Sequence, residues 1–119
     1  MLTPFGKAVR KMRIDLGMSL SEMAKKANKT SSYFSAIETG KRAVTEPLLE
    51  TVISILCQNR NDEKVLRVAA KETVETVDIN LIGKTDAARD FTLSFARRFD
   101  ELNDDDFESL SNILNKNNK

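Results

Sequence analysis

Apolar residues fall at intervals of three and four positions through most of this chain, with short polar or glycine-containing breaks between the segments. This period is that of an α-helix with one buried face. The pattern predicts helices over residues 4–16, 20–27, 31–39, 46–56, 62–77, 86–102 and 104–114. We therefore expect an all-α fold.

One stretch departs from this period. Val77, Ile79 and Leu81 alternate with polar residues, which predicts a short strand near residues 77–82. A lone strand needs a partner, so one interpretation is pairing between two copies of the chain, and the other is a plain extended linker. The polar break at residues 58–61 is the candidate boundary between an N-terminal domain, 1–60, and a helical extension, 61–119. Residues 115–119 are expected to fray.

Residues 17–42 carry the clearest local signals. Ser19 and Glu22 have the spacing of a capping box, which opens a helix. Asn28 tolerates the left-handed conformation that ends a helix, and Gly40 provides a second stop. Two short helices joined by a tight connection form the helix-turn-helix pattern. From capping and periodicity alone, a surface helix in an ordinary bundle is an equally good interpretation.

The second helix of this pair is the informative one, because its exposed face is small, polar and free of acids. Short hydroxyl and methyl groups let a helix approach base edges in the major groove of DNA. The side chains expected on this face are Ser31, Ser32, Tyr33, Ser35, Ala36 and Thr39.

Residues 4–57 resemble the Xre-type helix-turn-helix family, which includes phage lambda-like repressor and Cro domains. The resemblance implies a five-helix-type, lambda-repressor-like DNA-binding domain with a mostly helical C-terminal extension. The residues that carry it are Gly17, Ser19, Glu22, Met23, Ala24, Tyr33, Phe34, Ser35, Ile37, Glu38, Gly40, Lys41 and Arg42.

The resemblance also implies roles for individual residues. Arg13 and Glu38 match a structural ion pair that ties the first helix to the third. Leu20 departs from the family, since many members have a phosphate-binding Gln there, and Ser19, Ser21 or helix N-terminal amides could replace that contact. Base reading falls on Ser31, Ser32 and Ala36 with Tyr33 and Ser35 beside them, and phosphate contacts fall on Ser19, Lys29, Thr30, Thr39, Lys41 and Arg42.

The C-terminal segment is rich in phenylalanine at helical spacing. It either packs on the helix over 62–77 in the same subunit or forms a dimer or partner surface, and we expect some dimer contact because the segment is short for a core of its own. A fainter resemblance links it to regulators of phage and mobile elements that are often encoded beside a metallopeptidase. The residues expected on this dimer or partner surface are Ile79, Leu81, Phe91, Phe95, Phe99, Phe107 and Leu110.

Charge and composition narrow the function further. Residues 1–60 carry 10 Lys and Arg against 5 Asp and Glu, whereas residues 61–119 carry 9 against 13, so the N-terminal half suits phosphate contact. The chain has no His, one Cys and four Gly, so we expect no enzyme, no metal site and no cofactor. Cys57 is expected to be a buried structural thiol. Without an apparent signal peptide or membrane span, a cytoplasmic protein is expected.

Together these features predict a DNA-binding transcriptional regulator. We expect a dimeric repressor that binds a palindromic operator through its third helix in the major groove of double-stranded DNA. The alternative is an antitoxin, whose N-terminal domain binds DNA and whose C-terminal half binds a toxin; a toxin or a peptidase is then the protein partner. A third interpretation, an interaction module that has lost DNA binding, rests on the modest charge and the bland recognition face.

Overall fold

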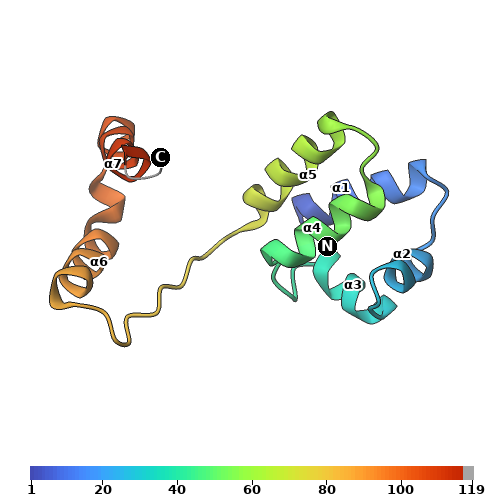
Figure 1. Cartoon of the computed structure of the whole chain (residues 1–119), viewed down its shortest axis with the longest axis horizontal. Coiled ribbons are helices and arrows are strands. Elements are labelled where there is room, and N and C mark those ends of the chain that lie inside the picture. Colours follow the sequence, from blue (N-terminus) through green and yellow to red (C-terminus); the bar gives the residue numbers. More distant parts are fainter. Residues whose placement is uncertain (117–119) are drawn as a thin grey trace. The chain divides into compact units, whose positions relative to one another are not determined.

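The computed structural model describes residues 1–116, and every regular element among them is helical, which confirms the all-α prediction (Figure 1). The chain divides into two compact units, Met1–Val77 and Asp78 onward. The first contains α1 (Pro4–Asp15), α2 (Leu20–Lys26), α3 (Ser31–Glu38), α4 (Glu46–Leu56) and α5 (Arg60–Thr73). The second contains α6 (Asp86–Arg98), the 3₁₀ turn η1 (Phe99–Glu101) and α7 (Asp104–Lys116).

Short-range capping determines where the helices of the first unit begin and end. The Ser19 hydroxyl accepts a hydrogen bond from the Glu22 amide at 3.0 Å, and the Glu22 carboxylate accepts one from the Ser19 amide at 3.1 Å. This is the capping box that the sequence predicts at the start of α2. Thr30 caps α3, and Asn28 and Gly40 follow α2 and α3 with φ angles of 59° and 80°.

The core of the first unit forms where α1 packs against α3, α4 and α5, with α2 on α3 and α4 on α5. Each helix contributes one apolar face, as expected for layers of amphipathic helices around a single core. The buried cluster consists of Phe5, Val9, Met23, Ala24, Phe34, Ile37, Leu48, Leu49, Val52, Leu56, Leu66 and Ala70.

The fifth helix belongs to this unit, so the chain divides after Val77 and not after residue 60. Asn59 caps α5 at its start, and the helix ends at Thr73, short of the predicted residue 77. There the Thr73 hydroxyl accepts a hydrogen bond from the amide of Phe5 in α1 at 2.9 Å. The apolar period of this segment predicted one buried face with Val65, Leu66, Ala69, Thr73 and Val77, of which Leu66 and Ala69 are buried whereas Val65 and Val77 are exposed. The period could not say which helices that face packs against.

The predicted strand near residues 77–82 is wrong for the described chain. Residues 74–81 have no regular structure, and residues 82–83 form a turn. A strand is stable only when its backbone groups pair with a neighbour, and the described residues offer no such neighbour. The side chains of Ile79 and Ile82 are 62% and 85% exposed. The extended linker, the second interpretation of this stretch, is what the structure contains.

The second unit is held together by aromatic contacts. The rings of Phe91, Phe95, Phe99 and Phe107 follow one another, with centroid separations of 5.8, 5.5 and 5.4 Å. Asn103 caps α7 by accepting a hydrogen bond from the Asp106 amide at 2.9 Å, directly before the helix predicted to begin at residue 104. No residue of α6, η1 or the described α7 is buried. Residues 117–119, part of the predicted fraying end, lie outside the described residues.

No helix in the described part of the chain combines the length and the apolar character that crossing a bilayer requires.

Candidate nucleic-acid interface

Helix α3 has a buried face and an exposed face, and of the predicted base-reading side chains Tyr33 packs against the core. Phe34 and Ile37 are 0% and 1% exposed and belong to the core. Ser32 and Ser35 are exposed, whereas Ser31, Tyr33 and Ala36 are half-buried. The first turn of α3 contains no acidic residue that would repel a phosphate. Among the predicted residues, Ser32 and Ser35 are therefore the two most accessible to a base edge.

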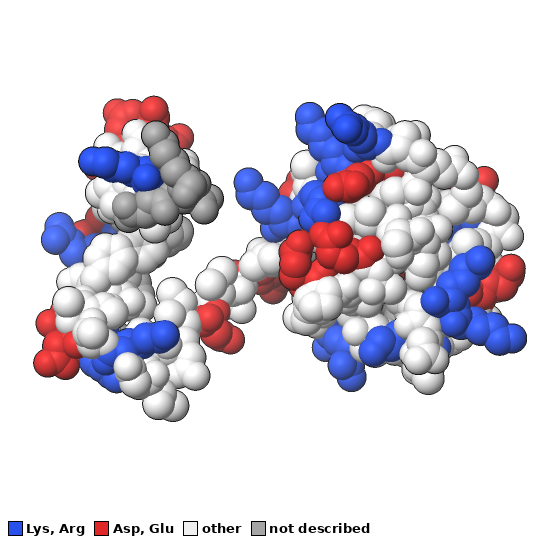
Figure 2. Space-filling view, viewed as in Figure 1, with Lys and Arg blue, Asp and Glu red and all other residues white. Residues whose placement is uncertain are grey.

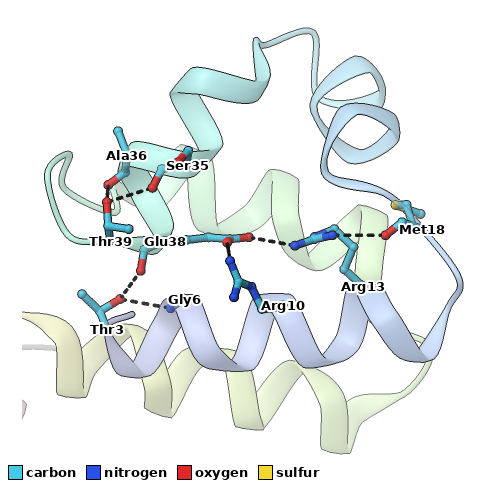
Figure 3. Close-up of polar contacts among 9 residues, drawn as sticks. All are labelled: Thr3, Gly6, Arg10, Arg13, Met18, Ser35, Ala36, Glu38 and Thr39. Carbon is cyan, nitrogen blue, oxygen red and sulfur yellow. Dashed lines mark hydrogen bonds and ion pairs between the residues drawn. The ribbon is translucent and has the colours of Figure 1, made fainter. Parts of the chain in front are cut away.

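A buried carboxylate at the end of α3 fixes this helix to α1 (Figure 3). The Glu38 side chain is 3% exposed, and its Oε2 lies 3.6 Å from Nη2 of Arg13, so the two residues predicted to pair do meet. Arg10 adds a second cation, with Nη2 at 3.8 Å from Glu38 Oε1. The sequence reasoning missed Arg10, although its position one helical turn before Arg13 could have indicated it.

The geometry of this cluster is that of an ion pair and not of a close hydrogen bond. Among the described residues, Arg13 Nε and Glu38 Oε2 are buried and have no hydrogen-bond partner. The Arg13 guanidinium also donates to the Met18 carbonyl at 3.3 Å, which ties the loop before α2 to the same cluster. The Glu38–Arg13 ion pair therefore stabilises the fold mainly through electrostatic attraction, in a site from which water is largely excluded.

The main chain of Glu38 makes a second attachment to α1. Its carbonyl accepts hydrogen bonds from the Thr3 amide at 3.0 Å and the Thr3 hydroxyl at 3.3 Å. Gly6 allows this approach, because a Cβ at that position would lie only 2.0 Å from the Glu38 carbonyl oxygen. Gly6 was not predicted to have a role, although a glycine inside a helix signals close packing.

Helices α2 and α3 are joined by their first turns. The hydroxyls of Ser21 and Ser31 lie 3.2 Å apart, within hydrogen-bond distance. Leu20, the departure from the Xre pattern, is half-buried and packs against the core. In this chain a pair of serines thus provides a polar link between the two helices while Leu20 contributes to packing.

The predicted phosphate-contacting residues differ in how free their polar groups are. The hydroxyls of Ser19 and Thr30 already cap helices. The Thr39 hydroxyl donates to the Ser35 carbonyl at 2.9 Å, so its proton is engaged within α3 (Figure 3). Lys41 is exposed. A phosphate would meet lysine and arginine more readily than it would meet the three hydroxyls.

Lys29 and Arg42 both lie against the ring of Tyr33. Lys29 Nζ is 5.0 Å from the ring centroid, and Arg42 Cζ is 4.7 Å from it. The ring also meets Phe34 edge-on, at a centroid separation of 5.5 Å and an angle of 82°. Tyr33, predicted as a base reader, is therefore engaged on the protein side of the helix by two cations and a core residue.

Lys and Arg side chains lie on several sides of the first unit, including the side of this helix. Figure 2 shows Lys and Arg atoms along the lower rim of the first unit, where Figure 1 draws α3, and Asp and Glu atoms over α4. The acidic group includes Glu46 and Glu50, which bind Arg67 of α5 at 3.4 and 2.6 Å, with Glu63 at 3.0 Å. Hydrogen bonds to the Glu50 carboxylate, and after it to the Glu63 carboxylate, raise the pKa of Arg67 above its usual value. The sequence reasoning missed this cluster.

Two further groups have shifted pKa values. The Ser19 amide, followed by its hydroxyl, lowers the pKa of Glu22 by hydrogen bonding to the carboxylate, and nearby Lys26 adds to the effect. The Cys57 thiol is half-buried, and this desolvation raises its pKa, with Asp62 and Glu63 adding to the rise. In the described residues, no group of three or more His, Cys, Asp and Glu side chains could hold a metal ion.

The residues predicted for a dimer or partner surface belong to the linker and to the helices of the second unit. Ile79 belongs to the linker, and Phe91 and Phe99 of the second unit are 59% and 49% exposed. The other four, Leu81, Phe95, Phe107 and Leu110, are half-buried. A groove of about 280 Å³ on the second unit is lined by Phe91, Ser94, Phe95, Arg98, Leu102 and Leu110.

Comparison with known proteins gives a family match and a similar solved structure. Residues 4–65 match the helix-turn-helix domain family, which is more than half of the chain. The crystal structure of the clp gene regulator ClgR from C. glutamicum is similar at 30% sequence identity and a TM-score of 0.49, over 61% of this chain and 92% of that one. The curated proteins contain no match to the chain.

Proposed function

This chain belongs to the helix-turn-helix domain family, and from that premise we propose that it is a sequence-specific transcriptional regulator, a repressor that binds DNA as a dimer. Helix α3 enters the major groove, Ser32 and Ser35 face the base edges, and Lys29, Lys41 and Arg42 hold phosphates on either side. Bound at a promoter, the protein blocks access of the polymerase.

The observation that carries this proposal is the exposed, acid-free face of α3, a helix that is anchored at its C-terminal end. Glu38 holds α3 on α1 through both its side chain and its carbonyl, so the exposed face is rigidly placed. A reading helix needs this rigidity, because direct readout depends on hydrogen bonds with narrow geometric limits. Serine can donate to or accept from several base edges, so DNA shape supplies part of the specificity.

Fluorescence anisotropy tests the DNA site directly. The protein is titrated onto a duplex from upstream of its own gene and onto a scrambled duplex, at two salt concentrations. We expect tighter binding to the first duplex, and weakening with salt because lysine and arginine contacts release counterions. Equal, weak binding to both duplexes would mean that the operator lies elsewhere, and no binding at low salt would remove the DNA-reading mechanism.

A pair of matched variants locates the contact. Ser35→Glu places a negative charge on the exposed face of α3, whereas Ser54→Glu makes the same change on an exposed position of α4. We expect Ser35→Glu to abolish binding, since a carboxylate facing phosphates and base acceptors is repelled. Ser54→Glu should bind as the wild type does. A similar loss in both variants would refute the assignment of α3 as the reading helix.

We propose that the second copy docks through the second unit. Its helices bury no residue, yet Phe91 and Phe99 expose about half of their surface beside an apolar groove. So small a unit, with no buried residue among those that the structure describes, is marginal alone, and packing against a copy of itself would cover this surface. Two copies place two reading helices on one face of DNA about 34 Å apart, which matches a palindromic operator.

The oligomeric state separates the repressor from the antitoxin. Light scattering behind size-exclusion chromatography should give a dimer for the wild type and a monomer for Phe91→Glu. A monomeric wild type that still binds DNA would favour the antitoxin, in which the exposed phenylalanines meet a toxin or peptidase instead. The antitoxin otherwise shares the DNA site, so anisotropy alone does not distinguish the two.

A further inference from the structure

We propose that Tyr33 is a positioning residue, which holds the two cations flanking the reading helix in place for phosphates and does not itself read bases. This inference rests on the proposed DNA binding. It reassigns Tyr33, the aromatic residue of α3 that is not fully buried, and it names the source of order in two long, charged side chains.

The two cations reach the ring from opposite ends of α3. Lys29 precedes the helix, directly before its cap, and Arg42 follows the turn at Gly40 that ends it. Their charged groups nevertheless lie 5.0 and 4.7 Å from the centroid of the same ring. Both separations are within the roughly 6 Å over which a cation is attracted to an aromatic face.

The ring is a fixed platform for these contacts. Tyr33 is half-buried, meets the fully buried Phe34 edge-on, and lines a depression of about 190 Å³ together with Pro47 and Leu48 of α4. Lysine and arginine lose much rotamer freedom when they bind a phosphate. Cations already ordered on the ring lose less of that freedom at the moment of binding, so the ring increases affinity without touching DNA.

This role depends on the face of the ring, not on its hydroxyl group. A base reader would use the hydroxyl as a hydrogen-bond donor or acceptor, and its loss would change which sequence is preferred. A residue that positions cations for phosphates affects every duplex alike, because phosphates carry no sequence information. It also changes the salt dependence, by about 0.9 in the logarithmic slope for each phosphate that is no longer neutralised.

The test compares Tyr33→Phe, which keeps the ring, with Tyr33→Leu, which removes it, on the own-gene and scrambled duplexes over a salt series. We expect Tyr33→Phe to bind within about twofold of the wild type. Tyr33→Leu should bind both duplexes on the order of tenfold more weakly, with the salt slope reduced by about 1 to 2. Adding Tyr33→Leu to a Lys29→Ala/Arg42→Ala background should cause little further loss. A changed preference between the duplexes at an unchanged slope would overturn the inference, and so would wild-type binding by Tyr33→Leu.

The contact of Lys29 and Arg42 with the Tyr33 ring can also be observed without DNA. In the wild type, the side-chain CH₂ protons of Lys29 and Arg42 next to their charged groups should show upfield ring-current shifts in NMR spectra, which Tyr33→Leu abolishes. If these shifts are present but the wild type binds neither duplex, the proposed DNA binding fails while the contact stands. If DNA is bound and the shifts are absent, the positioning role of Tyr33 fails while the proposed DNA binding stands. Should Tyr33→Leu not fold, Tyr33→Met takes its place, because its unbranched side chain fills similar space.

Discussion

Replacing Glu38 with alanine should lower the free energy of unfolding of the first unit more than almost any other single change near the interface. The Glu38 side chain is 3% exposed, and Arg13, 3.6 Å away, is 11% exposed. Alanine leaves the Arg13 charge inside the protein without its partner. Arg10 is 52% exposed and can turn back into water, so it suffers much less.

The size of the effect follows from the distance and the burial. At an effective dielectric constant of about 20, two unit charges 3.6 Å apart attract by about 4.5 kcal/mol before desolvation is counted. Breaking a buried pair by removing one partner costs about 3–5 kcal/mol. We expect about 3 kcal/mol for Glu38→Ala, since Arg10 already shares the carboxylate. A unit of this size has a free energy of unfolding of roughly 4–12 kcal/mol, so the loss is a large share of it.

Urea unfolding followed by far-UV circular dichroism measures this loss, with Arg10→Ala as the control. Arg10→Ala should cost less than about 1 kcal/mol, as exposed ion pairs do. Replacing both members of the buried pair, with Arg13→Met and Glu38→Leu together, should cost less than the sum of the single changes, because no buried charge is left over. A loss below about 1 kcal/mol in Glu38→Ala, or equal losses in Glu38→Ala and Arg10→Ala, would refute this reasoning.

Three further predictions concern other parts of the first unit. Gly6→Ala should lower the free energy of unfolding by about 3 kcal/mol, because the new Cβ would lie 2.0 Å from the Glu38 carbonyl oxygen and α1 would have to move away from the end of α3. A thermal melt measures this loss, and an unchanged melting temperature would contradict the prediction. The Cys57 thiol, with its pKa raised above 9.0, should react with iodoacetamide at pH 8 more slowly than free cysteine, and an equal rate would show that it is neither desolvated nor near carboxylates. Glu22 has a folded-state pKa below its usual 4.5, so its stabilisation of α2 is present above pH 4.5 and is lost as the pH falls through the folded-state pKa. An NMR titration of the carboxylate measures this shift, and Glu22→Gln should remove this part of the acid sensitivity.

The sequence predicted those parts of the fold that depend on neighbours in the chain. Caps and stops act over three or four residues, and this is why Ser19, Thr30 and Asn103 stand at the helix starts that were expected. The end of α5 and the division of the chain depend instead on contacts between distant segments. Leu66 is buried among residues of α1 and α4, and no periodic pattern reveals such neighbours.

The same limit applies to the interface. The exposed serines of α3 could be predicted, because a helix of known register has a known outer face. The environment of Tyr33 could not be, since Lys29 and Arg42 reach its ring only through the conformations of two loops. The Glu38 cluster was predicted in part, through the resemblance to a family, and its second arginine came only from the geometry of α1.

The separation between the anchored and exposed sides of α3 has a consequence for how this protein can evolve. Glu38, Phe34 and Ile37 fix the helix from its inner side, while Ser32 and Ser35 stand outside the core. Substitutions at such exposed positions usually change stability by less than about 0.5 kcal/mol. Under the proposed base-reading role of these two serines, a lineage can exchange them and acquire a new operator without a compensating mutation elsewhere, so diversification of its regulatory targets is decoupled from maintenance of the fold.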